Sequence, residues 1–137
     1  MKSEKSAQQL LTDLCSRDQR YPFEAYDFVI SALGYVQDEV ARLRVPKTES
    51  DVESKHVTGQ QLSEGCRDFA LQEFGLMAGA VLRNWNIHKT DDIGELVYNL
   101  IDIGLFSKQE TDSKEDFNGV YDMKTALSKG FSFNLCG

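Results

Sequence analysis

The fold is decided by residues 57–85, VTGQQLSEGCRDFALQEFGLMAGAVLRNW, which combine a helix-start signal with the longest apolar run in the chain. Thr58 followed by Gln61 fits a capping box, in which each side chain accepts a hydrogen bond from the other residue's backbone N–H. Val57 and Leu62 fit the hydrophobic staple that often accompanies such a box. These residues therefore predict a helix that begins next to Thr58.

This helix is expected to be central. Between residues 69 and 82 only Gln72 and Glu73 are strongly polar, so a helix there is apolar around much of its circumference. Such a helix must be packed on more than one side. We expect it to span about 58–84, with other helices wrapped around it.

Two further helices are predicted from their apolar spacing and end signals. One spans about 22–43, where apolar residues recur every three or four positions after Pro22. The other spans about 91–103, with acidic residues in its first turn and Gly104 at the position of a left-handed C′ residue.

The remaining chain predicts smaller features of a single domain, residues 1–137. Residues 1–19 contain a peripheral helix that could pack or fray, and residues 46–55 are a polar, mobile internal loop. Residues 105–121 suggest a small hairpin around a charged turn, and Phe131, Phe133 and Leu135 alternate with polar residues as in an edge strand.

The predicted fold class is therefore mainly α, a small helical domain around one central buried helix. A minor β element lies near the C-terminus, and its place after the 91–103 helix leaves a winged-helix-like arrangement open. A winged-helix domain that reads DNA is disfavoured. Its recognition helix would lie within residues 90–106, which contain four acidic side chains and no basic one, whereas a helix in the major groove needs Lys or Arg.

The net charge of −7 is uneven, since residues 90–137 contain nine acidic and four basic side chains and account for −5 of it. A negative field argues against binding to nucleic acid or an anionic membrane surface and leaves neutral or cationic partners possible. Three widely spaced cysteines suggest no disulfide framework, and no apolar run reaches 18 residues. We expect a cytoplasmic protein, with its oligomeric state open.

One face of the central helix suggests a close approach. At 100° per residue its narrow stripe contains Gly65, Asp68, Gln72, Gly75, Gly79 and Arg83. Glycines inside a helix cost about 0.5–1 kcal/mol each relative to alanine, so they imply a neighbouring backbone or a ligand. Helix packing is the first interpretation. The alternative is a binding groove, with Arg67, Asp68, Gly75, Gly79 and Arg83 as its candidate residues.

Glu73 and His56 are the candidates for catalysis. Glu73 is expected in the middle of the apolar face, where burial would raise its pKa and suit it to acid–base chemistry. The simpler interpretation is a carboxylate that is paired or reaches water. His56 precedes the helix start, where it could equally serve as a cap. No metal or cofactor motif is present, so no metal site and no cofactor are predicted.

Several motifs between Arg20 and Asp122 form a specific set: Arg20-Tyr21-Pro22, His56-Val57-Thr58-Gly59-Gln60, Arg67-Asp68, Phe74-Gly75, Gly94-Glu95, Asn99-Leu100, Gly104-Leu105, Asp116-Phe117 and Val120-Tyr121-Asp122. With them the chain resembles a small uncharacterised bacterial family described as restricted to Verrucomicrobia and Planctomycetes. The resemblance implies no activity or catalytic residue. The family is expected to have glutamine where Glu73 stands, which argues against a catalytic role for that carboxylate.

The sequence therefore favours a non-catalytic domain that binds another protein. The alternatives are an enzyme that uses Glu73 or His56 as acid or base, and a winged-helix-like regulator without strong DNA affinity.

Overall fold

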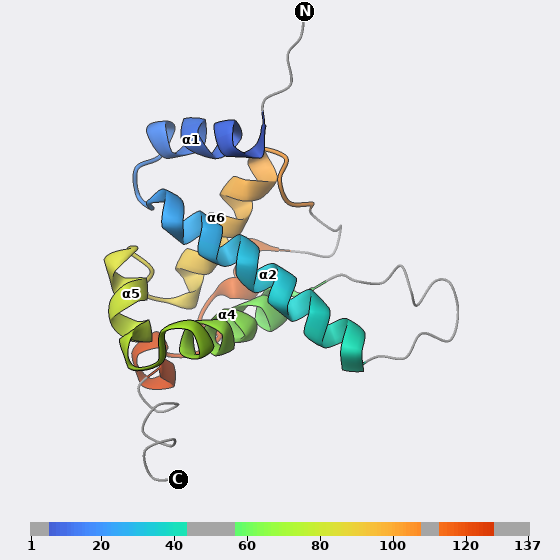
Figure 1. The fold of residues 1–137 in the computed structure, drawn as a ribbon, viewed down its shortest axis with the longest axis vertical. Coiled ribbons are helices and arrows are strands. Elements are labelled where there is room, and N and C mark those ends of the chain that lie inside the picture. The colour runs from blue at the N-terminus through green and yellow to red at the C-terminus, as the bar shows by residue number, and fades with distance from the viewer. Residues whose placement is uncertain (1–5, 44–56, 108–112, 128–137) are drawn as a thin grey trace, which may run out of the picture.

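The computed structural model describes residues 6–43, 57–107 and 113–127 of the chain. Those residues form a small all-α domain without a strand (Figure 1). It has five α-helices and two 3-10 helices, η1 and η2: α1 Ala7–Arg17, α2 Phe23–Leu43, α4 Gly59–Phe74, η1 Gly75–Met77, α5 Ala78–Asn84, α6 Thr90–Asp102 and η2 Lys114–Phe117. A further helical turn covers residues 123–127.

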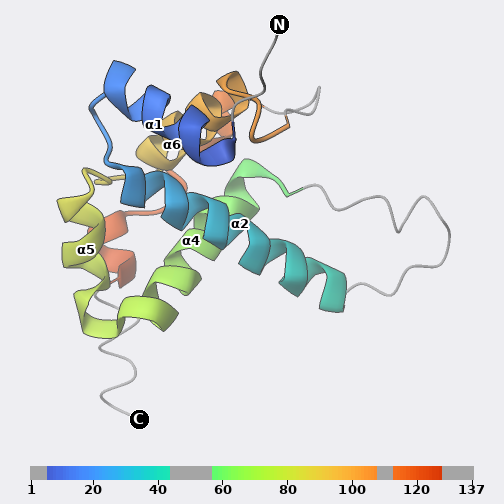
Figure 2. The ribbon, with the colours of Figure 1, turned by 45° about the horizontal axis from the view of Figure 1, so that its top comes forward.

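The crossing of α2 over α4 organises the core, and it is visible in both Figure 1 and Figure 2. The helices approach closely at Gly65, where an added Cβ would lie 1.9 Å from Cγ2 of Val36. Tyr26 and Val29 of α2 and Cys66 of α4 are fully buried. The glycine is therefore what allows the valine of α2 to sit against the backbone of α4.

Phe117, in η2, forms a second packing centre. A Cβ at Gly59 of α4 would lie 3.2 Å from the Phe117 ring and 2.9 Å from Cβ of Asp116. A Cβ at Gly94 of α6 would lie 3.0 Å from the same ring and 2.9 Å from Cβ of Phe117. The buried hydroxyl of Thr90 donates to the carbonyl of Phe117 at 2.6 Å and accepts from the N–H of Val120 at 3.0 Å. These contacts hold the segment after α6 against both helices.

Polar side chains tie the start of α2 to α6 on the surface. Arg20 contacts Asp18 at 2.8 Å and Glu95 at 3.2 Å, and Lys114 contacts Glu95 at 2.9 Å. The hydrogen bond from Arg20 lowers the pKa of Asp18 to about 2. Arg20 and Glu95 are 75 residues apart in the sequence, so this network joins the segment before α2 to α6.

The local signals for helix ends are confirmed. The Thr58 side chain accepts from the N–H of Gln61 at 3.0 Å and the Gln61 side chain accepts from the N–H of Thr58 at 2.9 Å, which completes the capping box. At the end of α6, Gly104 has a φ of +86° and the N–H of Leu105 donates to the carbonyl of Leu100 at 2.9 Å. That pattern is the predicted glycine cap.

Two predictions about secondary structure are wrong. The helix expected over 58–84 is broken by η1, because Gly75 adopts a positive φ and ends α4. The hairpin expected over 105–121 is absent from the described residues, where Lys114–Phe117 is a 3-10 helix capped by Ser113 and Asp116. The predicted loop 46–55 and strand 131–135 lie outside the described residues.

Residues 1–19 were expected to hold a peripheral helix that packs or frays, and α1 packs. Leu11 and Leu14 are buried, and α1 contacts α2. The Ser6 side chain caps the helix by accepting from the N–H of Gln9 at 3.2 Å.

Candidate functional site

The break between α4 and α5 forms the candidate site. Gly75 has φ +52° and ψ −123°, a conformation that residues with a Cβ rarely adopt, and its N–H donates to the carbonyl of Leu71. One 3-10 turn follows before α5 begins at Ala78. We call Gly75, Leu76, Met77, Gly79 and Arg83 the α4–α5 corner.

Leu76 and Met77 project from this corner into solvent. Their exposed fractions are 68% and 58%, the highest among the large hydrophobic residues that the structure describes. The expectation that the apolar run is packed on more than one side therefore does not hold at Leu76 and Met77. A helix wheel assumes a continuous helix, and the break at Gly75 leaves Leu76 and Met77 pointing away from the core.

The residues on both sides of the exposed pair are firmly held. The ring centroid of Phe74 lies 5.8 Å from that of Trp85 and 6.3 Å from that of Phe28. Ala78 and Leu82, in α5, are almost completely buried. Leu76 and Met77 are thus exposed on a fixed turn, and no motion of the flanking helices is needed to present them.

The two other glycines of the predicted stripe differ from expectation. A Cβ at Gly75 would meet nothing within 4 Å, and one at Gly79 would meet Arg83 Nη1 at 3.3 Å and Leu127 Cδ1 at 4.0 Å. The close helix packing expected at Gly75 and Gly79 instead occurs at Gly65. Since the helix breaks at Gly75, residues before and after it no longer share one face.

Glu73 lies in the last turn of α4 and its side chain is exposed. The prediction that Glu73 lies in the middle of an apolar helix face is wrong, because α4 ends at Gly75 and the apolar residues after it do not continue that face. The expectation that the carboxylate is paired or reaches water is confirmed by its exposure. The burial that would have suited Glu73 to acid–base chemistry is absent, and His56 lies outside the described residues.

Arg67 and Asp68 belong to a different place in the fold. They form an ion pair at 2.9 Å, and the Arg67 guanidinium lies 5.6 Å from the ring centroid of Tyr121. The Tyr121 hydroxyl donates to the carbonyl of Ser63 at 2.6 Å, and burial raises its pKa. These contacts fasten the segment after η2 to α4. The structure therefore separates Arg67 and Asp68 from the α4–α5 corner.

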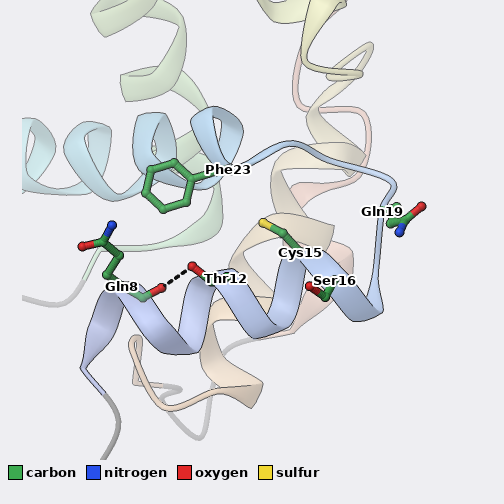
Figure 3. A pocket seen from close by; sticks show the side chains of 6 residues that line it. All are labelled: Gln8, Thr12, Cys15, Ser16, Gln19 and Phe23. Atoms are coloured by element: carbon green, nitrogen blue, oxygen red, sulfur yellow. Dashed lines mark hydrogen bonds between the residues drawn. The ribbon is translucent and has the colours of Figure 1, made fainter.

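A groove of about 440 Å³ lies between α1 and the start of α2 (Figure 3). Its lining residues are Gln8, Thr12, Cys15, Ser16, Gln19 and Phe23. The pKa of the Cys15 thiol is raised, first by burial and then by the nearby carboxylates of Glu24 and Asp18. Because the thiolate is the nucleophile, this environment does not activate Cys15. The groove has no arrangement for nucleophilic catalysis.

No three His, Cys, Asp or Glu side chains of the described residues are grouped to hold a metal ion. None of the helices in residues 6–43, 57–107 and 113–127 has the length and apolar content needed to cross a bilayer.

Sequence reasoning missed Leu76 and Met77 as surface residues, although one signal could have found them. Gly75 can be interpreted as a C′ residue that ends a helix, which is a common role for glycine. Leu76 would then follow the cap, and the apolar run would divide into two helices.

Comparison with known proteins finds no family model, no curated protein and no solved structure that matches this chain. The resemblance to the family of Verrucomicrobia and Planctomycetes therefore stays a prediction.

Proposed function

We propose that this domain binds another protein through the α4–α5 corner and has no catalytic role of its own. The observation that carries the proposal is the exposure of Leu76 and Met77, two consecutive large apolar side chains on a fixed turn. Burying either side chain in an interface would yield up to about 1.5–3 kcal/mol. Scattered exposed hydrophobic residues are ordinary, whereas adjoining ones mark contact sites.

The surroundings suggest the kind of partner. Glu73 is exposed two residues before Gly75, and the chain as a whole carries a net charge of −7. A complementary surface would offer an apolar recess for Leu76 and Met77, with a lysine or arginine at its edge. Charge complementarity of this kind mainly speeds association and excludes unsuitable partners.

The two other functions that the sequence left open have weaker support. Enzymatic use of Glu73 would require a desolvated carboxylate, and this one is exposed. A winged-helix-like regulator would require a β wing, and the described part of residues 105–121 contains the 3-10 helix η2 in its place.

The test is affinity capture from the native cell with three versions of the full chain. The baits are the parent, a Leu76→Ser/Met77→Ser variant and a Phe23→Ser control. Phe23 is 40% exposed at the start of α2, so its replacement also removes an exposed hydrophobic side chain, but outside the corner. Thermal melts first establish that all three baits are folded.

We expect the parent and the Phe23→Ser control to retain a common protein, with at least a tenfold lower yield for the corner variant. Mixing purified partner with each bait then establishes direct binding. Equal capture by all three baits would show that the corner is not the binding surface.

A further inference from the structure

The chain leaves the described residues next to the α4–α5 corner. The helical turn 123–127 lies beside α5 in Figures 1 and 2. Leu127 is 5% exposed, and its Cδ1 would be 4.0 Å from a Cβ at Gly79, two residues after Met77. Leu127, the last residue described before the C-terminal segment, therefore lies close to the helix that follows the exposed pair.

Residues 128–137, SKGFSFNLCG, have the composition of a segment that could cover that pair. Phe131, Phe133 and Leu135 are separated by Ser132 and Asn134, so in an extended conformation the three apolar side chains would share one side. The segment contains one basic and no acidic side chain. It therefore lacks the charge that would keep it away from Glu73.

The distance to be covered is short. Phe131 is the fourth residue after Leu127, and an extended chain spans at most about 3.3–3.6 Å per residue, or roughly 13–14 Å here. Gly79 is the second residue after Met77, so their Cα atoms are at most about 7 Å apart. Phe131 can thus reach the corner without rearrangement of the helices.

We propose that residues 128–137 dock on Leu76 and Met77 and compete there with the protein partner. The competition rests on the proposed function, but the docking does not. A tethered segment with a short linker has an effective concentration in the millimolar range, so even weak apolar contacts would favour it over a second copy of the chain at micromolar concentration. A partner would then bind only by displacing the segment.

The docking is tested by replacing Leu76 with the photoreactive residue p-benzoylphenylalanine in the full chain. Irradiation at low micromolar concentration should join position 76 to a residue in 128–137 of the same molecule, as identified by mass spectrometry of the peptides. The same replacement at Asp102, an exposed residue of α6, is the control for unspecific capture.

Two variants of the segment sharpen the result. Phe131→Ser/Phe133→Ser should lower the yield of the intramolecular product at least fivefold, because it removes the two aromatic contacts. Ser132→Ala/Asn134→Ala changes the intervening residues and should leave the yield within twofold. A product with another part of the chain, a covalent dimer whose yield rises with concentration, or no product at all would overturn the docking.

The two proposals fail in different ways. If both are correct, Phe131→Ser/Phe133→Ser should also capture at least threefold more partner than the parent. Corner-dependent capture without the intramolecular product would refute the docking alone. The intramolecular product without any corner-dependent partner would refute the proposed function and make the segment a permanent cover.

Discussion

Adding a methyl group at Gly65 should destabilise the crossing of α2 and α4. In Gly65→Ala the new Cβ would lie 1.9 Å from Cγ2 of Val36, well inside the van der Waals contact distance. Both residues belong to helices and Val36 is 6% exposed, so neither the backbone nor the side chain can move freely. The helices must separate locally or Val36 must leave its rotamer.

The magnitude follows from two opposing effects. Replacing glycine by alanine inside a helix stabilises it by about 0.5–1 kcal/mol when nothing obstructs the methyl group. Overpacking a core costs typically about 1–3 kcal/mol. Gly34 of α2 is the matched control, because a Cβ there meets no atom within 4 Å. Gly34→Ala should stabilise the protein, and the difference between the two variants should be about 1–3 kcal/mol.

Chemical denaturation and thermal melts measure this difference, which corresponds to roughly 4 °C per kcal/mol for a chain of this size. A double-mutant cycle identifies the cause. Val36→Ala alone removes two methyl groups, at about 0.8 kcal/mol each, but it also removes the atom that obstructs Gly65→Ala. The double variant should therefore be more stable than the sum of the single effects predicts. If Gly65→Ala melts at or above the parent temperature, the packing described at this crossing is incorrect.

Three further outcomes are expected. Asp18→Asn should cost about 1 kcal/mol or less at pH 6, since Asp18 and Arg20 are partly exposed. The pKa of Asp18 is lowered from 3.8 to about 2, so this stabilisation is complete above pH 3.8 and is lost as the pH falls toward 2. The melting temperatures of parent and variant should therefore converge over that range, and a constant difference between them would contradict the prediction. Thr90→Val should cost about 2–3 kcal/mol in urea unfolding, because it leaves the buried carbonyl of Phe117 and the part-buried N–H of Val120 without their partner. Thr90→Ser keeps the hydroxyl and should cost about 1 kcal/mol; similar losses in the two variants would show that the hydroxyl contributes little. Gly75→Ala should cost about 1–3 kcal/mol, because a residue with a Cβ is strained at this positive φ although the methyl group itself would meet no neighbour. Calorimetry measures the loss, and an unchanged melting temperature would contradict the prediction.

Features that depend on neighbouring residues in the sequence could be predicted. The capping box of Thr58 and Gln61 needs residues three apart, and the cap at Gly104 needs residues within one turn. The start of α2 after Pro22 is of the same kind. In each case the groups that satisfy the helix end lie within a few residues of it, so the sequence contains nearly all the information.

Contacts between distant segments could not be predicted in the same way. Nothing near Arg20 indicates that its partner is Glu95, 75 residues away. Likewise, Gly65, Gly75 and Gly79 all satisfied the pattern of a packed helical glycine. Only the position of Val36 on another helix distinguishes Gly65 from the others. The candidate site was missed because it depends on which of these glycines is helical and which ends a helix.

The break at Gly75 also explains why the candidate site lies where it does. A continuous helix would have placed Leu76 and Met77 one turn after Gln72 and Glu73, with the wheel directing Met77 toward the same face as Cys66 and Phe69. Because α4 ends at Gly75, Met77 does not gain that burial, which is worth up to about 1.5–3 kcal/mol for a side chain of its size. The aromatic contacts of Phe74 with Phe28 and Trp85 and the burial of Leu82 hold the flanking helices in place. The apolar side chains between them are therefore exposed on a turn whose flanks are held in place, which is the surface that the proposed docking of residues 128–137 requires.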